Sequence, residues 1–179
     1  MRRATIAVLA LSLAGAAQAQ EPAAKRSDDM VDALAAAGLD PETKVENGKV
    51  QVMLQQRAII RLAQGGEPVL ADVETGRLGL ALPDGAETYK GVGANRMAFA
   101  LDASPQKRQS IMKVWNGLAV PVAFETEIAA VRQGQLMRRM TSVCVVPAGG
   151  TNVETWPDPV VAVTIQKFAP PAADTPTCD

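Results

Sequence analysis

The sequence predicts an all-β fold, mainly antiparallel, that forms a β-sandwich or a partly open barrel with one short N-terminal helix. Apolar and polar side chains alternate in short runs after residue 49, and turn residues separate these runs at near-regular spacing. The helix–strand rhythm of a parallel α/β fold does not appear. About eight or nine short strands of this kind are typical of sandwiches and barrels.

Residues 1–19 predict a secretory signal peptide. Arg2 and Arg3 precede a short apolar run, and Ala17 and Ala19 provide the small side chains of a cleavage site. The apolar run is about a dozen residues long, whereas a membrane span needs roughly 20. We therefore expect cleavage after Ala19, export to the periplasm or the medium, and no transmembrane segment in the mature chain.

The mature chain is expected to form one domain with short extensions. The leader holds two of the 18 basic residues and none of the 19 acidic ones, so the mature protein is slightly acidic. Nucleic-acid binding, which needs a clustered basic surplus, is not expected. The pattern divides the chain into an extension with a short helix (20–48), a β-sandwich domain (49–168) and a proline-rich tail (169–179).

The one predicted helix lies within the extension. Ser27 can cap its first free amides, the two following aspartates suit the positive end of the helix dipole, and Gly38 is placed to end it. Asn47 and Gly48 then predict a turn. The alternating runs that follow predict strands over 50–54, 59–62, 69–74, 78–82, 96–102, 120–130, 137–146 and 160–168. In the last strand Val161, Val163 and Ile165 are expected to face inward.

Two segments of the domain are less regular. Residues 104–117 fit a helix or a strand, and we favour a strand at about 110–115, because Asn116-Gly117 is a strong hairpin signal. Residues 147–159 contain three prolines and a glycine pair, which predicts a long, stiff loop that joins the last two strands.

Cys144 and Cys178 are the only cysteines of the chain. In an exported protein a lone pair predicts a disulfide, which would pin the proline-rich tail onto the domain. The chain-entropy model gives such a loop a stabilisation of roughly 3–4 kcal/mol. A redox-active pair is disfavoured because such cysteines usually lie close together in the sequence. A bridge to a partner chain is the alternative.

Several catalytic devices are missing from the sequence. The chain has no histidine, which excludes Ser-His-Asp and Cys-His catalysis and the usual histidine-based metal sites. Ser110 and Lys113 match a Ser-x-x-Lys spacing, but that device needs a helix turn where a strand is at least as well indicated, and its companion motifs are absent. Residues 91–95 begin like a phosphate loop, yet a strand pattern follows instead of a helix, which favours a plain glycine turn.

The remaining candidate site residues are carboxylates, tryptophans and arginines. Two pairs of acids at two-residue spacing could serve a glycoside hydrolase if they faced each other across a cleft, although solvation of the outer face of a sheet explains them more simply. Tryptophans can stack on a ligand or cover the end of a core. Paired arginines can contact an anionic polymer or partner. These candidates are Asp72, Glu74, Glu125, Glu127, Trp115, Trp156, Arg138 and Arg139.

From these observations we expect an exported, non-catalytic β-sandwich module of the cell envelope that binds a protein or an envelope component or serves a structural role. The alternative is a carboxylate-based hydrolase or carbohydrate-active protein that uses the acid pairs. No cofactor and no metal site are expected, because the sequence holds no motif for either.

Overall fold

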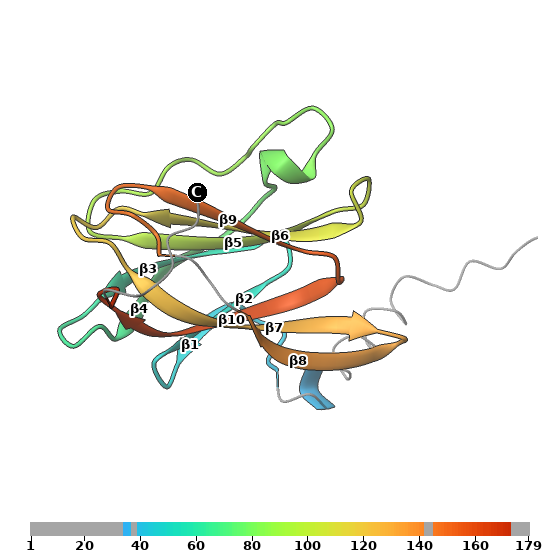
Figure 1. Cartoon of the computed structure of the whole chain (residues 1–179), viewed down its shortest axis with the longest axis horizontal. Coiled ribbons are helices and arrows are strands. Elements are labelled where there is room, and N and C mark those ends of the chain that lie inside the picture. Colours follow the sequence, from blue (N-terminus) through green and yellow to red (C-terminus); the bar gives the residue numbers. More distant parts are fainter. Residues whose placement is uncertain (1–33, 37–38, 142–144, 173–179) are drawn as a thin grey trace, which may run out of the picture.

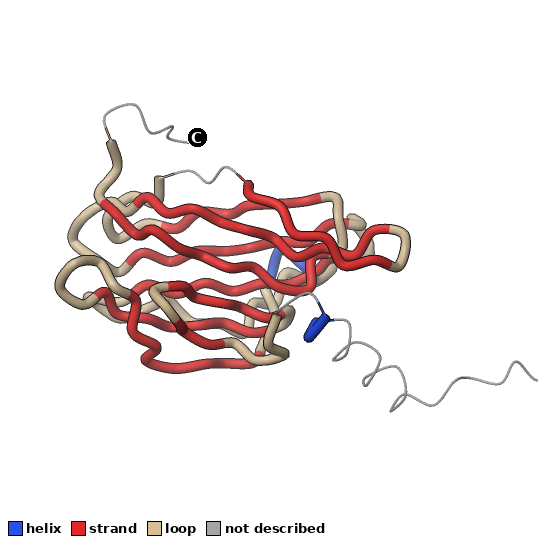
Figure 2. The backbone as a smooth tube through the Cα atoms, turned by 90° about the horizontal axis from the view of Figure 1, so that it is seen from below, coloured by secondary structure: helices blue, strands red, loops and turns tan. Residues whose placement is uncertain are grey.

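The computed structural model describes residues 34–36, 39–141 and 145–172, and it confirms an antiparallel β-sandwich. In the described residues ten strands form two five-stranded sheets that pack face to face (Figure 1). Most of the described backbone is strand, with turns and loops at the strand ends (Figure 2). Because the two sheets stay separate, the fold is a sandwich and not a partly open barrel.

The first sheet, sheet A, holds the strands nearest the two ends of the described chain. Its strand order is β1-β2-β10-β7-β8, and every neighbouring pair is antiparallel. The strands are β1 (Lys44–Glu46), β2 (Lys49–Met53), β10 (Val160–Ala169), β7 (Ala123–Arg132) and β8 (Gln135–Thr141).

The second sheet, sheet B, is formed by four consecutive strands from the middle of the chain and by one strand that directly precedes the last strand of sheet A. Its strand order is β4-β3-β5-β6-β9, again antiparallel throughout. The strands are β4 (Pro68–Thr75), β3 (Gln56–Leu62), β5 (Met97–Ser104), β6 (Gln109–Asn116) and β9 (Thr151–Trp156).

The main core lies between the two sheets and consists of the alternate side chains that the two-residue period predicts. Phe99 of β5 lies at its centre, in edge-on contact with Phe124 of β7 and Phe168 of β10. Burial of these aliphatic and aromatic groups supplies the main driving force of folding. The other members from the strands are Val50, Val52, Ala58, Ile60, Met97, Leu101, Met112, Val114, Ile128, Ala130, Trp156, Val160, Val163 and Ile165.

Each sheet also carries a smaller apolar cluster on its outer face. Residues 76–95, named the covering segment below, lie over sheet B and pack Leu78, Ala81 and Tyr89 against outward-facing side chains of β3, β5 and β6 (Figure 1). On sheet A, Leu34 and Leu39 pack over part of the outer face. No other described segment packs its apolar side chains over the rest of that face.

The strand predicted over 78–82 is wrong. This part of the covering segment contains a short 3-10 helix, Gly79–Ala81, and no strand. Leu78 is fully buried, whereas Leu80 is 44% exposed, because the segment packs against a sheet face and does not pair along a sheet edge. Gly79 permits this close approach, since a Cβ there would lie 2.4 Å from the carbonyl oxygen of Gly85.

The long loop predicted over 147–159 is also wrong, because it contains β9. This strand pairs with β6 at the edge of sheet B, in a continuous register from Ser110–Trp156 to Trp115–Thr151. Its core-facing positions include the polar residues Asn152 and Glu154. An edge strand tolerates such residues, so the apolar alternation that identifies a central strand is missing.

The hairpin predicted at Asn116-Gly117 does not form. The strand at 110–115 is confirmed as part of β6, but the chain then crosses to β7 in the other sheet. The Asn116 amide instead donates hydrogen bonds to the carbonyl oxygens of Val120, Val146 and Pro147 at 2.9–3.1 Å. Asparagine thus stabilises a crossover loop here.

Another turn prediction, at Asn47-Gly48, is confirmed, and a second hairpin turn has the same form. Asn47 and Gly48, both with positive φ, join β1 to β2, and Gln133-Gly134 joins β7 to β8 in the same way. Positive φ at both central residues matches the twist of a two-residue hairpin. In β10 a register shift between Val160 and Ala162 leaves Val161 only partly buried, so its predicted inward position is wrong.

The ends of two predicted elements fall partly outside the described residues. Only 34–36 of the predicted N-terminal helix is described, and it is helical. The strand predicted over 137–146 is observed as β8, which ends at Thr141; Val146 forms an isolated bridge with Val122. The described residues contain no helix of the length and apolar character that crossing a membrane requires.

Candidate functional site

The four candidate carboxylates are placed on two different outer faces. Asp72 and Glu74 lie on β4, on the outer side of sheet B, whereas Glu125 and Glu127 lie on β7, on the outer side of sheet A. Glu74 forms an ion pair with the buried Arg57, and the other two ion pairs are Glu125–Lys167 and Glu127–Arg138. The main core separates the two pairs of acids, so they do not line one cleft.

Trp115 lies beneath the covering segment and does not present its ring to solvent. The guanidinium group of Arg57, which is 2% exposed, is stacked 4.9 Å from the ring centre of Tyr89 and 5.1 Å from that of Trp115. Arg57 also donates hydrogen bonds to the carboxylate of Glu74 and to the carbonyl oxygen of Lys90. The tryptophan therefore belongs to a structural cluster of cations and aromatic rings.

Two ion pairs fasten the covering segment to sheet B. The fully buried carboxylate of Asp102 accepts hydrogen bonds from Nε of Arg77 and from the backbone amide of Leu78. Lys113, in turn, binds Glu87 of the segment at 2.8 Å. Burial raises the pKa of Tyr89 to about 12, and the nearby negative charge of Asp102 adds to this shift.

Trp156 and Ser110 occupy the inner side of sheet B. Trp156 is 7% exposed and belongs to the main core, as expected for a tryptophan that covers the end of a sandwich. The Ser110 hydroxyl donates to the carbonyl oxygen of Asp158 and accepts from the amide of Val160. Lys113 lies on the opposite face of β6, so the Ser-x-x-Lys spacing does not bring the two side chains together.

Arg138 and Arg139 lie on β8, the outermost strand of sheet A. Arg138 is on the outer face, in an ion pair with Glu127 of the neighbouring strand. Arg139 is on the inner face and binds Asp158 of the β9–β10 turn at 3.1 Å. Arg132 binds the other carboxylate oxygen of Asp158 at 3.0 Å. These pairs hold both arginine side chains against the body of the domain.

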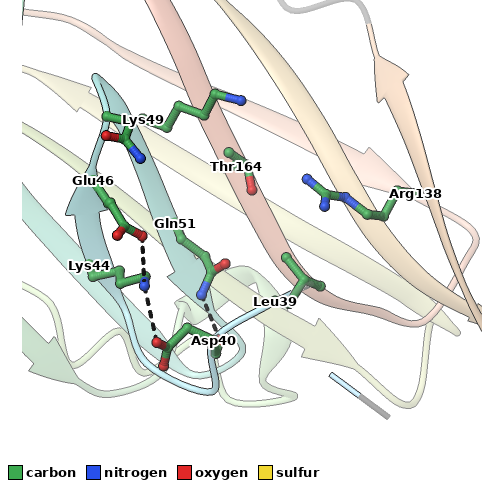
Figure 3. Close-up of a pocket in the computed structure, with 9 residues that line it drawn as sticks. Leu39, Asp40, Lys44, Glu46, Lys49, Gln51, Arg138 and Thr164 are labelled. Carbon is green, nitrogen blue, oxygen red and sulfur yellow. Dashed lines mark hydrogen bonds and ion pairs between the residues drawn. The ribbon is translucent and has the colours of Figure 1, made fainter. Parts of the chain in front are cut away.

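A polar hollow of about 280 Å³ lies on the open part of the outer face of sheet A (Figure 3). Thr164 is on its floor, and Lys49 and Arg138 extend toward this threonine from opposite sides. Lys49 has no ion pair with any of the described residues, so its charge remains available on this face. The hollow is shallow and rich in charge, as expected of a contact surface and unlike an enclosed substrate pocket.

The other wall of the hollow is an ion-pair network on the β1–β2 hairpin. The ammonium group of Lys44 lies 3.0 Å from Asp40 and 2.8 Å from Glu46. The hydrogen bond from Lys44 lowers the pKa of Asp40, and the hydrogen bond to Glu46, with that to Asp40, raises the pKa of Lys44. Both shifts keep these groups charged over the physiological pH range.

The sequence did not identify the apolar part of the β8 surface. Met137 and Met140 are 52% and 48% exposed, and with the two arginines between them they form the surface Met137–Met140, named the β8 surface below. The only signal in the sequence was that two methionines flank two arginines. Whether such a run is exposed depends on whether another strand covers it, which local pattern cannot show.

The described residues contain no group of three or more His, Cys, Asp or Glu side chains that could hold a metal ion. Cys144 and Cys178 lie outside the described residues, so their disulfide stays a prediction. No family model, no curated protein and no solved structure matches this chain.

Proposed function

We propose that this protein is exported and acts as a non-catalytic binding module of the cell envelope, with the β8 surface and the adjoining hollow as its contact site for a partner protein. The observation that carries the proposal is the exposure of Met137 and Met140 on an outermost strand. Met137 and Met140 lie on opposite faces of β8, and each leaves a large apolar side chain at the surface. Methionine is also adaptable in shape, which suits contact surfaces.

The charges near β8 support a partner with acidic groups. Arg132, Arg138 and Arg139 place three guanidinium groups on and beside β8, where Glu127 and Asp158 bind them. Lys49 adds a further cation on the same outer face. Arginine and methionine are enriched in protein interfaces, whereas lysine and glutamate are depleted. The hydrolase alternative receives no such support, because the two pairs of acids lie on opposite outer faces and Glu74, Glu125 and Glu127 are held in separate ion pairs.

Site-specific photo-crosslinking in the native host tests the contact site. A photoreactive amino acid at Met140 should yield an adduct of one defined mass. The same amino acid at Leu80, which is 44% exposed on the covering segment of the other sheet, should not yield that adduct. Absence of an adduct from Met140, or the same adducts from both positions, would contradict the proposal.

Cell fractionation with mass analysis tests the export. The protein recovered from the envelope or the medium should begin at Gln20, and its two cysteines should be oxidised. An uncleaved chain confined to the cytoplasm would contradict export. Free thiols at Cys144 and Cys178 in the exported protein would contradict the disulfide alone.

A further inference from the structure

We propose that a groove at one end of the sandwich binds an extended segment of a partner protein in which an apolar residue is flanked by acidic residues. The groove, named the turn groove below, has a volume of about 280 Å³ and lies between the β5–β6 turn and the β9–β10 turn. Residues 103–105 and 108–110 form one wall, and residues 157–159 form the other. The turn groove shares no residue with the β8 surface, so the inference does not depend on that surface as a contact site.

The strand register of β6 brings the two turns side by side. Ser104 and Gln109 close the β5–β6 hairpin, and the next residue of β6, Ser110, is paired with Trp156 at the end of β9. Both turns therefore lie at the same end of sheet B, where the chain passes from β9 to β10 of sheet A. The groove is thus a product of tertiary structure, since its two walls come from distant parts of the chain.

Both walls of the turn groove are held in place without a ligand. The Ser110 hydroxyl donates a hydrogen bond to the carbonyl oxygen of Asp158 and accepts one from the amide of Val160, each at 2.8 Å. The carbonyl oxygen of Pro159 accepts a hydrogen bond from the amide of Val131 at 3.0 Å. A groove of fixed shape loses little conformational freedom when a ligand binds, which favours affinity.

The wall formed by the β9–β10 turn offers apolar surface and few hydrogen-bonding groups. Pro157 and Pro159 are exposed, and proline has no N–H group to donate. The carbonyl oxygens of Asp158 and Pro159 already accept hydrogen bonds from within the domain. On the facing wall, Ala103 and Pro105 add further apolar surface. An apolar side chain is therefore the group that fits between the two walls.

The available charge at the turn groove is positive. Arg108 lines the groove and Lys107 precedes it; both are exposed, and neither forms an ion pair with any of the described residues. Of the described residues that line the groove, Asp158 is the only acidic one, and Arg132 and Arg139 bind its two carboxylate oxygens. A ligand with carboxylates beside its apolar group therefore complements this charge.

The size and position of the turn groove favour a peptide segment over a small free molecule. Its volume lies below the roughly 300–1,000 Å³ of typical small-molecule pockets. It is bounded by two turns with exposed prolines, so it is open to a chain longer than the groove itself. When an extended segment places an apolar side chain between the walls, the long side chains of Lys107 and Arg108 can reach the carboxylates of the neighbouring residues.

Three short peptides with blocked ends test the inference on the mature, full-length protein. Gly-Glu-Leu-Glu-Gly should bind, with NMR amide shifts centred on Ala103, Gln109 and Asp158. Gly-Lys-Leu-Lys-Gly should bind about tenfold more weakly or worse, because its charges oppose Lys107 and Arg108. Gly-Glu-Ser-Glu-Gly should also lose about tenfold, because it has no apolar side chain for the groove. Equal binding of all three, no binding of the first peptide, or shifts centred elsewhere would overturn the inference.

Two variants that each remove one positive charge locate the binding cation. R108N removes the charge at the groove, and asparagine suits the positive φ of 50° at this position. R61Q removes an exposed charge of β3 outside the groove. R108N should weaken binding of the acidic leucine peptide about three- to tenfold, whereas R61Q should change it less than about twofold. Equal effects would overturn the inference, while the Met140 crosslink tests a different surface and is unaffected by that result.

A second copy of this chain is a poor occupant of the turn groove. Among the described residues, only Asp72-Val73-Glu74 has a branched aliphatic residue between two acids. The Glu74 carboxylate is already bound by the buried Arg57 of its own domain. We therefore expect the mature protein to sediment as a monomer. A dimer that R108N dissociates would show a second copy in the groove and would overturn its assignment to a partner protein.

Discussion

Both outer faces of this sandwich carry arginine–carboxylate ion pairs, but these pairs are buried on sheet B and lie near the surface on sheet A. On sheet B, the covering segment buries Arg57 and Asp102 beneath aromatic and aliphatic groups, so their hydrogen bonds hold the segment in place. On sheet A, the described residues cover only a small part of the face, and the ion pair between Arg138 and Glu127 is partly exposed. The two faces show that an arginine–carboxylate pair has no fixed role, because its depth decides its energetic weight.

The largest expected difference between the two faces is in the free energy of unfolding that is lost when one carboxylate is removed from each face. D102A should lower the free energy of unfolding by about 3–5 kcal/mol, because it leaves Arg77 and the Leu78 amide without their buried acceptor. E127A, on the open face, should cost less than about 1 kcal/mol. Urea unfolding of both variants measures these values. Comparable losses would mean that the two faces do not differ as described.

The next effect concerns how tightly the covering segment is seated. G79A should destabilise by about 1–3 kcal/mol, because its Cβ would lie 2.4 Å from a backbone oxygen of Gly85. Gly91, in the same segment, has open space around it, and G91A should change stability by less than about 0.5 kcal/mol. Thermal unfolding compares the two variants, and a G79A protein as stable as G91A would argue against close packing there.

A pH-dependent effect of intermediate size arises from Tyr89. The pKa of this phenol is raised from its ordinary value of 10.0 to about 12, so its contribution to stability is fully present below pH 10 and is lost as the pH rises toward 12. At pH 11 the loss should be about 1 kcal/mol. Y89F cannot ionise, so its unfolding free energy should fall less steeply above pH 10. Parallel curves for the two proteins would refute a buried phenol.

The smallest effect tests the open face directly. A double-mutant cycle of R138A and E127A should give a coupling energy below about 1 kcal/mol, and this energy should shrink as salt is added. Solvent and ions screen exposed charges, whereas the pair under the covering segment is shielded. A coupling of several kcal/mol that salt does not change would place Arg138 in the same class as Arg57.

Sequence reasoning was most successful where local chemistry is decisive. The alternation of Phe124, Thr126 and Ile128 identified β7, and the positive-φ residues Asn47 and Gly48 identified a hairpin turn, because both signals depend only on near neighbours. It failed at Leu78 and at Asn116, where distant parts of the chain determine the conformation. A carboxylate of β5 fixes the first, and the carbonyl oxygens of two loops fix the second.

The candidate site could be predicted only in part. Arg138 and Arg139 were identified, since paired arginines are conspicuous in any sequence. The exposure of Met137 and Met140 was missed, because apolar side chains in a strand are expected to be buried. Trp115 was a candidate ligand contact because tryptophan rings can stack on ligands. Its ring is, however, covered by residues that precede it by more than twenty positions in the chain.

By itself, the sequence determined the class of this protein: alternating side chains and positive-φ turns specify antiparallel strands, and the missing histidine removes whole groups of catalytic mechanisms. Tertiary structure alone decided which outer face is covered, which strand is left at an edge and which ion pairs are buried. The physical reason is the distance along the chain over which each effect acts. Backbone preference acts between neighbouring residues, whereas burial depends on segments brought together from far along the chain.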